Sequence, residues 1–251
     1  MKVDLIFGPK DLREDRHYGG SLVIDILRAT SVMTTLVARG APAVLLAKNI
    51  DHAKELKSTL GEGWYTSGSR HGKKVDGFDY ANAMIDFDKS DLTQQNFILS
   101  TTNGTGTIYR TWPQTKHMVV GALLNASATA SAIWQILQRT KEDFLIVISG
   151  VRGEYSLDDA LTAGVILEKL LEQHPACQLT DEARTCLLLS RGAGDIKEEL
   201  LNSRTGVYLT EAGLSDEIGF TLQIDKYDVA IEVQEIGHMP NVLGIAQLAL
   251  L

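Results

Sequence analysis

One arrangement occurs four times in this chain: an apolar run of strand length leads through small polar residues or glycine into the start of a helix. The four junctions lie at 25–31, 100–106, 121–127 and 149–156. Strands that alternate with helices in this way are typical of α/β proteins, in which helices cover both faces of a sheet. We therefore expect an α/β fold with three layers, α/β/α, and a largely parallel or mixed sheet, formed by a single domain over residues 1–251.

The composition restricts the partners and the location of the protein. A length of 251 residues with 44% hydrophobic residues is enough for a full core, and a net charge of −8 argues against a protein that neutralises nucleic-acid phosphates. The beginning, MKVDLIFGPK, is not a signal peptide, and no apolar run reaches membrane-spanning length. Cys177 and Cys186 have neither metal nor redox spacing, which suits a reducing compartment. We expect a cytoplasmic protein that binds neither nucleic acid nor membranes.

The first junction places a carboxylate inside an apolar run. Asp25 lies within 22–27, which has the composition of a buried strand, and Arg28 precedes a helix-like segment with Thr30 or Ser31 as N-cap. The carboxyl ends of parallel strands are where α/β sheets bind ligands. An ionised Asp that is buried without a partner is strongly unfavourable. Asp25 therefore needs a cation, and the candidates are Arg28 and a divalent metal ion.

The second junction, STTNGTG at 100–106, has two interpretations. It resembles a loop that binds an anion, because its glycines let backbone N–H groups approach an oxyanion, its hydroxyls add donors and a helix N-terminus follows. It is equally explained as an ordinary turn with a capped helix start. No lysine follows the glycines, so it is not a Walker A loop.

The fourth junction, GVRGEYSLDDALTAG, carries an arginine between two glycines and then a pair of acids. The spacing of Ser156 and Asp159 is that of a capping box, and Asp158 and Asp159 both suit the positive end of a helix dipole. Alternatively, one of these acids binds a metal ion beside Asp25, because Mg²⁺ is usually held by one or two carboxylates together with waters and substrate oxygens.

The familiar covalent phosphatase signatures do not fit. Arg70 and His71 belong to an RHG tripeptide like that of histidine phosphatases, but no buried strand precedes it, so we interpret His71 as a coincidence and Arg70 as a possible anion ligand. Neither cysteine has an arginine at the thiol-phosphatase spacing, and the pattern DxDxT is absent. If the chain is an enzyme, metal-assisted attack by water is the default mechanism.

Several segments together resemble the 2-phosphosulfolactate phosphatase family of coenzyme M biosynthesis. They are VIDILRATS, STTNGTG, VGALLNASATASA, GVRG with SLDDALTAG, GFDYANA and QIDKYDV, and they span nearly the whole chain in family order. The resemblance implies a three-layer α/β/α fold and Mg²⁺-dependent hydrolysis of a phosphate monoester whose remainder carries a carboxylate and a sulfonate. The family type also suggests a homodimer.

The resemblance and the residue patterns together give a set of candidate site residues. We assign catalytic roles to Asp25, Arg28, Arg152 and Asp159, and Mg²⁺ binding to Asp25, Asp158 and Asp159. The family resemblance also implies a site role for Asn125. The expected substrate ligands are Thr30, Ser31, Arg70, Thr101, Thr102, Asn103, Gly104, Thr105, Gly150 and Gly153. Direct attack by water and a phospho-enzyme on Thr or Ser are both compatible with this set.

The chain departs from the family pattern at three places. The family pattern G-E-R reads Gly68-Ser69-Arg70 here, which removes an acid, and its G-N-S-P reads AlaAsnAlaMet at 81–84. A family glutamate is replaced by the shorter Asp158. The loss of an acid at Ser69 motivates a second hypothesis, in which the chain binds an anionic metabolite without hydrolysing it.

Overall fold

The computed structural model describes residues 1–70, 72–237 and 239–249. Its main feature is a ten-stranded sheet with the order β10-β1-β9-β2-β8-β11-β12-β3-β7-β4. The strands are β1 (Lys2–Ile6), β2 (Gly20–Ile24), β3 (Val44–Leu46), β4 (Trp64–Ser67), β7 (Asn96–Leu99), β8 (Met118–Val120), β9 (Phe144–Ile148), β10 (Gln178–Leu179), β11 (Ala230–Glu235) and β12 (Leu243–Leu248). A separate small hairpin pairs β5 (Ser69–Arg70) with β6 (Lys73–Lys74).

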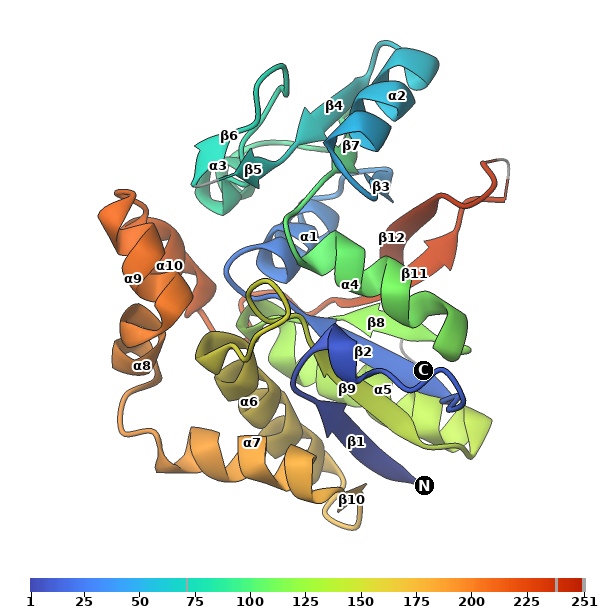
Figure 1. Ribbon diagram of the computed structural model, residues 1–251, viewed down its shortest axis with the longest axis vertical. Helices are drawn as coiled ribbons and strands as arrows, with labels where there is room; N and C mark the ends of the chain where they lie inside the picture. Colours follow the sequence, from blue (N-terminus) through green and yellow to red (C-terminus); the bar gives the residue numbers. More distant parts are fainter. Residues whose placement is uncertain (71, 238, 250–251) are drawn as a thin grey trace.

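The helices cover both faces of this sheet (Figure 1). They are α1 (Ala29–Ala38), α2 (Ile50–Leu60), α3 (Met84–Lys89), α4 (Gly104–Thr111), α5 (Ala126–Thr140), α6 (Leu157–Gln173), α7 (Asp181–Gly192), α8 (Ile196–Asn202), α9 (Arg204–Glu211) and α10 (Ser215–Thr221). Short 3₁₀ turns occupy Pro9–Asp11, Trp112–Gln114 and Leu123–Asn125. No helix within the described ranges is long and apolar enough to cross a membrane.

The sheet consists of two parallel groups joined by an antiparallel hairpin. Strands β10, β1, β9, β2 and β8 are mutually parallel, and so are β3, β7 and β4. Between them, β11 pairs antiparallel with β8, β12 pairs antiparallel with β3, and the two pair antiparallel with each other. The sheet is therefore mixed, as the sequence predicted, and its two parallel groups run in opposite directions.

Alternating side chains of the buried strands divide the core between the two faces. In β2, Leu22 and Ile24 pack into the apolar cluster that includes residues of α5 and α6, whereas Val23 packs into the cluster that includes residues of α1. Strand β9 alternates in the same way, with Ile146 on the first face and Val147 on the second. Because successive strand residues point to opposite faces, a continuous apolar run indicates a strand covered on both sides. The three-layer α/β/α prediction is confirmed.

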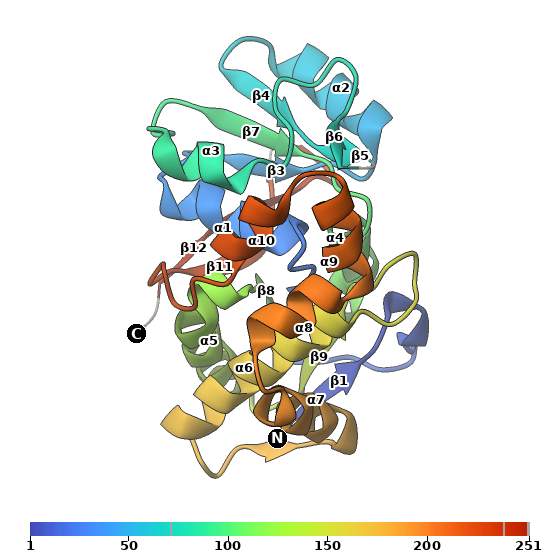
Figure 2. The same ribbon diagram turned by 90° about the vertical axis from the view of Figure 1, so that its left-hand side faces the viewer.

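The three helices α8, α9 and α10 form a wall at one side of the sheet (Figures 1 and 2, orange). Helix α8 and helix α9 pack against α6, and α10 packs against α3. Because α6 lies between β9 and β10 of the first parallel group and α3 lies between β4 and β7 of the second, this wall bridges the two halves of the sheet.

Candidate active site

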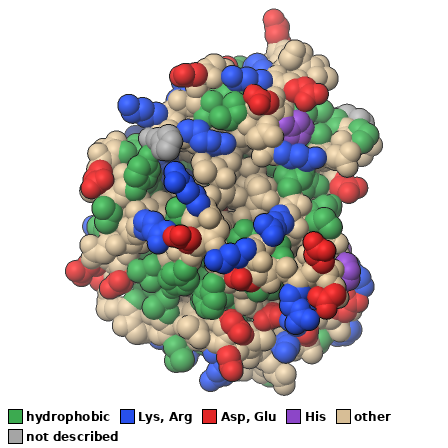
Figure 3. Space-filling view, in the orientation of Figure 1, with side chains coloured by type: hydrophobic (Ala, Val, Ile, Leu, Met, Phe, Trp, Pro, Cys, Tyr) green, Lys and Arg blue, Asp and Glu red, His purple; other side chains and the backbone are tan. Residues whose placement is uncertain are grey.

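A cavity of about 570 Å³ lies between the two parallel groups and under the wall formed by α8 to α10. Its lining comes from the segments that follow β2, β4, β7 and β9, together with one face of α9. Figure 3 shows Lys and Arg side chains around this hollow. Residues that follow the carboxyl ends of strands from both groups line this cavity, although the two groups run in opposite directions in the sheet. The sequence had predicted convergence along one sheet edge.

Three of the four predicted junctions reach the cavity. The junctions at 25–31, 100–106 and 149–156 all contribute lining residues, whereas 121–127 contributes none. Asn125 from that fourth junction is buried, and its side chain accepts from the N–H of Ala122 (2.9 Å) and donates to the carbonyl of Val229 (2.9 Å). These bonds connect the start of α5 to the start of strand β11. Asn125 therefore has a structural role, and it does not border the cavity.

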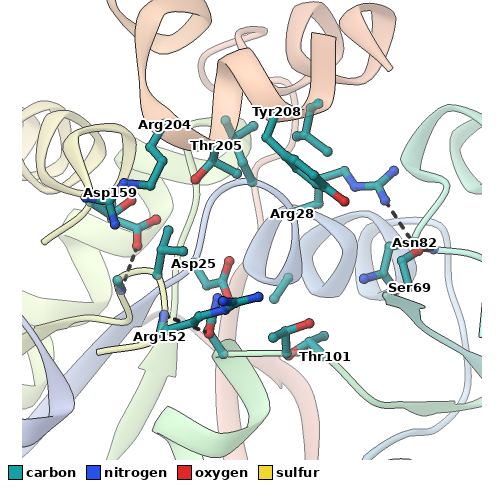
Figure 4. Close-up of a pocket in the computed structure, with 18 of the residues that line it drawn as sticks. Asp25, Arg28, Ser69, Asn82, Thr101, Arg152, Asp159, Arg204, Thr205 and Tyr208 are labelled. Atoms are coloured by element: carbon teal, nitrogen blue, oxygen red, sulfur yellow. Dashed lines mark hydrogen bonds between the residues drawn. The ribbon is translucent and has the colours of Figure 1, made fainter. Parts of the chain in front are cut away.

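Two buried carboxylates face the cavity (Figure 4). Asp25, 8% exposed, follows β2, and its carboxylate accepts hydrogen bonds from the N–H groups of Gly104 and Ala29. Asp159, 3% exposed, lies in the first turn of α6; it accepts from the N–H of Ile26 at 2.9 Å and from that of Gly150 at 3.1 Å. Each acid therefore joins two segments of the chain around the cavity.

Both acids lack a cationic partner. Burial, and then repulsion by Asp158, raises the pKa of Asp25 to about 7. Burial and repulsion by Asp158 and Asp25 raise the pKa of Asp159 well above its usual value. In the part of the chain that the structure describes, no ion pair joins either carboxylate to a Lys or Arg, and Arg28 does not contact Asp25. Of the two candidate partners for Asp25, Arg28 is therefore ruled out in the described structure.

The oxygen atoms of Asp25 and Asp159 suit a hard divalent cation such as Mg²⁺. Among the described residues, no three His, Cys, Asp or Glu side chains are grouped so that they could hold a metal ion by themselves. A site of two carboxylates is nevertheless compatible with Mg²⁺, which takes its other ligands from water and substrate oxygens. Asp25 and Asp159 can therefore hold the ion only if water and substrate oxygens supply its other ligands.

The third predicted metal ligand, Asp158, does not border the cavity. The hydroxyl of Ser156 donates to its Oδ1 at 2.6 Å, and Ser203 and Thr205 also hydrogen-bond to its carboxylate. Asp158 thus fastens the start of α6 to the start of α9. The capping box is absent as well, since Ser156 makes no side-chain cap bond and Asp159 accepts from other segments.

Four arginines line the cavity: Arg28, Arg70, Arg152 and Arg204. Arg70 is tied to main-chain carbonyls, donating to that of Ser69 at 3.0 Å and to that of Thr101 at 3.4 Å. Arg204, on α9, pairs with Glu154 at 2.6 Å. The four guanidinium groups come from four separate segments of the chain, so the positive charge of the site is created by folding.

Arg152 is carried by a tight turn. Val151 and Glu154 exchange both main-chain hydrogen bonds, at 3.0 and 3.1 Å, and the two residues between them have positive φ angles of 53° and 79°. Two central residues with positive φ are the mark of a type I′ turn, which explains the glycine at 153. Gly153 does not line the cavity, so its place is to form this turn, whereas Gly150 does line it.

Two predicted substrate ligands, Thr30 and Ser31, do not contact the cavity and instead hold the residues around Asp25, which does. Thr30 and Ser31 are fully buried; the hydroxyl of Thr30 accepts from the N–H of Asp25 (3.3 Å), and that of Ser31 donates to the carbonyl of Ile26 (2.8 Å). They build the turn that holds Asp25 and do not border the cavity.

The STTNGTG segment both lines the cavity and caps a helix start. Thr101, Thr102 and Asn103 line the cavity, whereas Gly104 and Thr105 do not. The N–H of Thr105 donates to the hydroxyl of Thr101 at 2.9 Å, which caps the helix start. Gly104 packs so closely that a Cβ would lie 2.7 Å from the Cβ of Ala29. The part that lines the cavity and the part that begins the helix are therefore successive residues of one turn.

Sequence reasoning assigned no site role to seven polar lining residues: Ser69, Asn82, Glu154, Ser156, Arg204, Thr205 and Tyr208. Asn82 lies in the segment GFDYANA, which resembles a family segment, but the resemblance gave no role to Asn82 itself. The three residues of α9 carry no local motif that distinguishes them from any short surface helix. His71 lies outside the described residues.

Fold and cavity together define an α/β protein whose cavity is lined by four arginines and two buried acids. Comparison with known proteins makes this class specific. The chain belongs to the 2-phosphosulpholactate phosphatase family, whose model matches residues 6–236. It is accordingly a phosphatase, a hydrolase of phosphate monoesters.

Curated relatives support the same assignment. The chain is 30% identical to a probable 2-phosphosulfolactate phosphatase of Clostridium novyi, over 96% of this chain and 99% of that protein. It is 35% identical to one of Deinococcus radiodurans, over 85% of this chain and 88% of that protein. A protein with the same description from Clostridium perfringens is 32% identical over 92% and 93% of the two chains. The predicted family is thus confirmed.

Proposed function

We propose that this protein hydrolyses 2-phosphosulfolactate to sulfolactate and phosphate, that the reaction depends on Mg²⁺, and that it serves coenzyme M biosynthesis in the cytoplasm. The observation that carries the proposal is the meeting of four arginines and two unpaired buried acids in one cavity of about 570 Å³. A ligand with a phosphate, a sulfonate and a carboxylate supplies the negative charges that the arginines require. The printed names of the relatives support this choice of substrate.

In the proposed mechanism Asp25 and Asp159 hold Mg²⁺, and Asp158 has no part in binding it. The ion, when bound, polarises the phosphoryl group and lowers the pKa of a bound water. Arg152 binds phosphoryl oxygens by charge-assisted hydrogen bonds. The segment of Thr101 to Asn103 places the N-terminus of α4 at the cavity, where backbone N–H groups favour negative charge.

The direct test is phosphate release from racemic 2-phosphosulfolactate by the purified protein. We expect turnover with Mg²⁺, loss of turnover when EDTA removes the metal, and recovery when Mg²⁺ is added back. Turnover that EDTA does not change would contradict the metal dependence. The matched comparison is Asp25→Asn against Asp15→Asn, because Asp15 is exposed, pairs with Arg13 and does not line the cavity.

One observation favours the second candidate function, an anion-binding protein without hydrolysis. Ser69 replaces the glutamate of the family pattern, and the structure places it in the cavity wall, where Arg28 donates to its hydroxyl at 3.3 Å. Under this alternative, sulfolactate and phosphate raise the melting temperature, but no phosphate is released from the ester at any Mg²⁺ concentration.

A further inference from the structure

One corner of the cavity holds a buried amide whose hydrogen bonding is incomplete. Asn82 is 6% exposed, and its Oδ1 has no hydrogen-bond partner among the described residues. Its backbone N–H donates to the hydroxyl of Ser69 at 2.9 Å, so the residue is held in place while its side-chain oxygen is unpaired. A buried polar atom without a partner costs about 1–3 kcal/mol and calls for an explanation such as a ligand.

The guanidinium beside this amide is also underused. Arg28 is 7% exposed, and in the described part of the chain the hydroxyl of Ser69 is the one acceptor it contacts, at 3.3 Å. A guanidinium has five N–H donors. Glu217 and Tyr208 face Arg28, but no carboxylate among the described residues lies within ion-pair distance of it, and Glu217 accepts from the N–H of Met84 at 3.0 Å. Arg28 therefore has donors to spare for an anion.

The hydroxyl of Ser69 completes the corner. It accepts from Arg28 and from the N–H of Asn82, which occupies both of its lone pairs. Its own O–H has no acceptor among the described residues and is free to donate. Because Oδ1 of Asn82 is an acceptor, the group of this side chain that can donate to an anion is the Nδ2 of the same amide. Three neighbouring side chains thus offer donors to the same part of the cavity.

This corner lies apart from the acids that the proposed mechanism uses. In Figure 4, Arg28, Ser69 and Asn82 lie together at one end of the cavity, Asp159 lies at the other, and Asp25 and Arg152 lie between them. A small molecule whose phosphate lies beside Asp25 can therefore extend its other end toward the corner.

We propose that Arg28, Ser69 and Asn82 form a second anion subsite, which binds the non-reacting sulfonate or carboxylate of the substrate and selects phosphate monoesters that carry such a group. The identity of that substrate rests on the proposed function. Asn82 and Ser69 are specificity-determining residues in this account, because they contact the group that distinguishes one phosphate monoester from another.

Isothermal titration of four non-reacting probes tests the subsite without any turnover: sulfolactate, inorganic phosphate, lactate and 2-hydroxypropanesulfonate. In Asn82→Ala and Ser69→Ala we expect sulfolactate to bind about tenfold more weakly or worse, as for the loss of one hydrogen bond to a charged group. Binding of inorganic phosphate should change by less than about twofold, since these side chains lie away from the phosphate position. Of the two single-anion probes, the one whose binding the variants weaken identifies the group in the corner.

The matched control is Arg39→Gln, at the other end of α1, where Arg39 donates to the carbonyl of Ser90 outside the cavity. Asn82→Ala keeps the main-chain bond to Ser69, so its circular dichroism and melting temperature report whether the fold is intact. Equal weakening of phosphate and sulfolactate, or no weakening of either, would overturn the subsite.

The two proposals fail in different ways. Suppose that the wild type binds sulfolactate, that Asn82→Ala binds it more weakly, and that the wild type releases no phosphate from the ester. This result would contradict the proposed function and support the subsite. A wild-type protein that releases phosphate, with unchanged sulfolactate binding in both variants, would contradict the subsite and support the function.

Discussion

At the scale of single residues, the site is defined by two buried acids that have no cationic partner among the described residues. Asp25 and Asp159 are each fixed by two main-chain N–H donors and face one cavity. The sequence predicted Asp25 because a carboxylate inside an apolar run is costly to bury, and Asp159 as a second carboxylate at a helix start that could bind a metal ion beside Asp25. It also predicted Asp158, but adjacent acids on a helix point in different directions, and only the contacts of the folded chain show which one faces the ligand.

The first prediction at this scale concerns catalysis. Asp25→Asn keeps the size of the side chain but removes the charge that holds the metal in the proposed mechanism, and we expect kcat/KM to fall by about a hundredfold or more. The assay is phosphate release at saturating Mg²⁺, with Asp15→Asn as the control. A near wild-type rate in Asp25→Asn would identify Asp25 as a structural acid.

The second prediction concerns the stability of the metal-free protein. The pKa of Asp25 rises from 3.8 to about 7 on folding, so the folded state holds this proton more tightly than the unfolded chain. The resulting stability is fully present below pH 3.8 and is lost as the pH rises through about 7. In EDTA we therefore expect the melting temperature to fall between pH 5 and pH 8 by more in the wild type than in Asp25→Asn. Equal slopes in scanning calorimetry would refute this role for Asp25.

At the scale of elements, the start of α4 must lie very close to the carboxylate of Asp25. A Cβ at Gly104 would lie 3.0 Å from Oδ2 of Asp25 as well as against Ala29. The glycine therefore lets the helix N-terminus reach the carboxylate. The sequence showed the glycine in a turn, but the need for close approach depends on α1, which is far away in the chain.

The glycines of α4 give a matched pair of variants. Gly104→Ala forces this contact apart and should destabilise the protein by about 1–3 kcal/mol and reduce activity. Gly106→Ala, on the same helix with no atom within 4 Å of the added Cβ, should leave activity unchanged and stabilise the protein by about 0.5–1 kcal/mol. Denaturant titration and phosphate release measure the two effects. Similar behaviour of the two variants would show that α4 does not need to approach Asp25.

At the scale of the whole molecule, the cavity exists because two parallel groups and the α8 to α10 wall come together. The α/β class and the mixed sheet followed from local patterns in the sequence. The wall did not, because Arg204 and Tyr208 reach the site through tertiary contacts, such as the pair of Arg204 with Glu154 50 residues away, and nothing in their local sequence records those contacts. The homodimer and the single domain stay predictions.

The wall makes a testable contribution through Arg204. This exposed residue pairs with Glu154 across the cavity mouth, and exposed pairs contribute at most about 1 kcal/mol to stability. Arg204→Gln should therefore leave the melting temperature almost unchanged and raise KM for the multiply charged substrate about tenfold. The control is Arg191→Gln, which breaks a comparable helix-surface pair with Glu168 away from the cavity. Equal KM values in the two variants would remove α9 from the binding site.

The most direct measurement is a crystal structure of the protein with Mg²⁺, phosphate and sulfolactate. The account predicts a metal ion bound by oxygens of Asp25 and Asp159, with phosphate between that ion and Arg152. A metal ion bound elsewhere, or phosphate outside the cavity while both carboxylates keep only their main-chain partners, would contradict it.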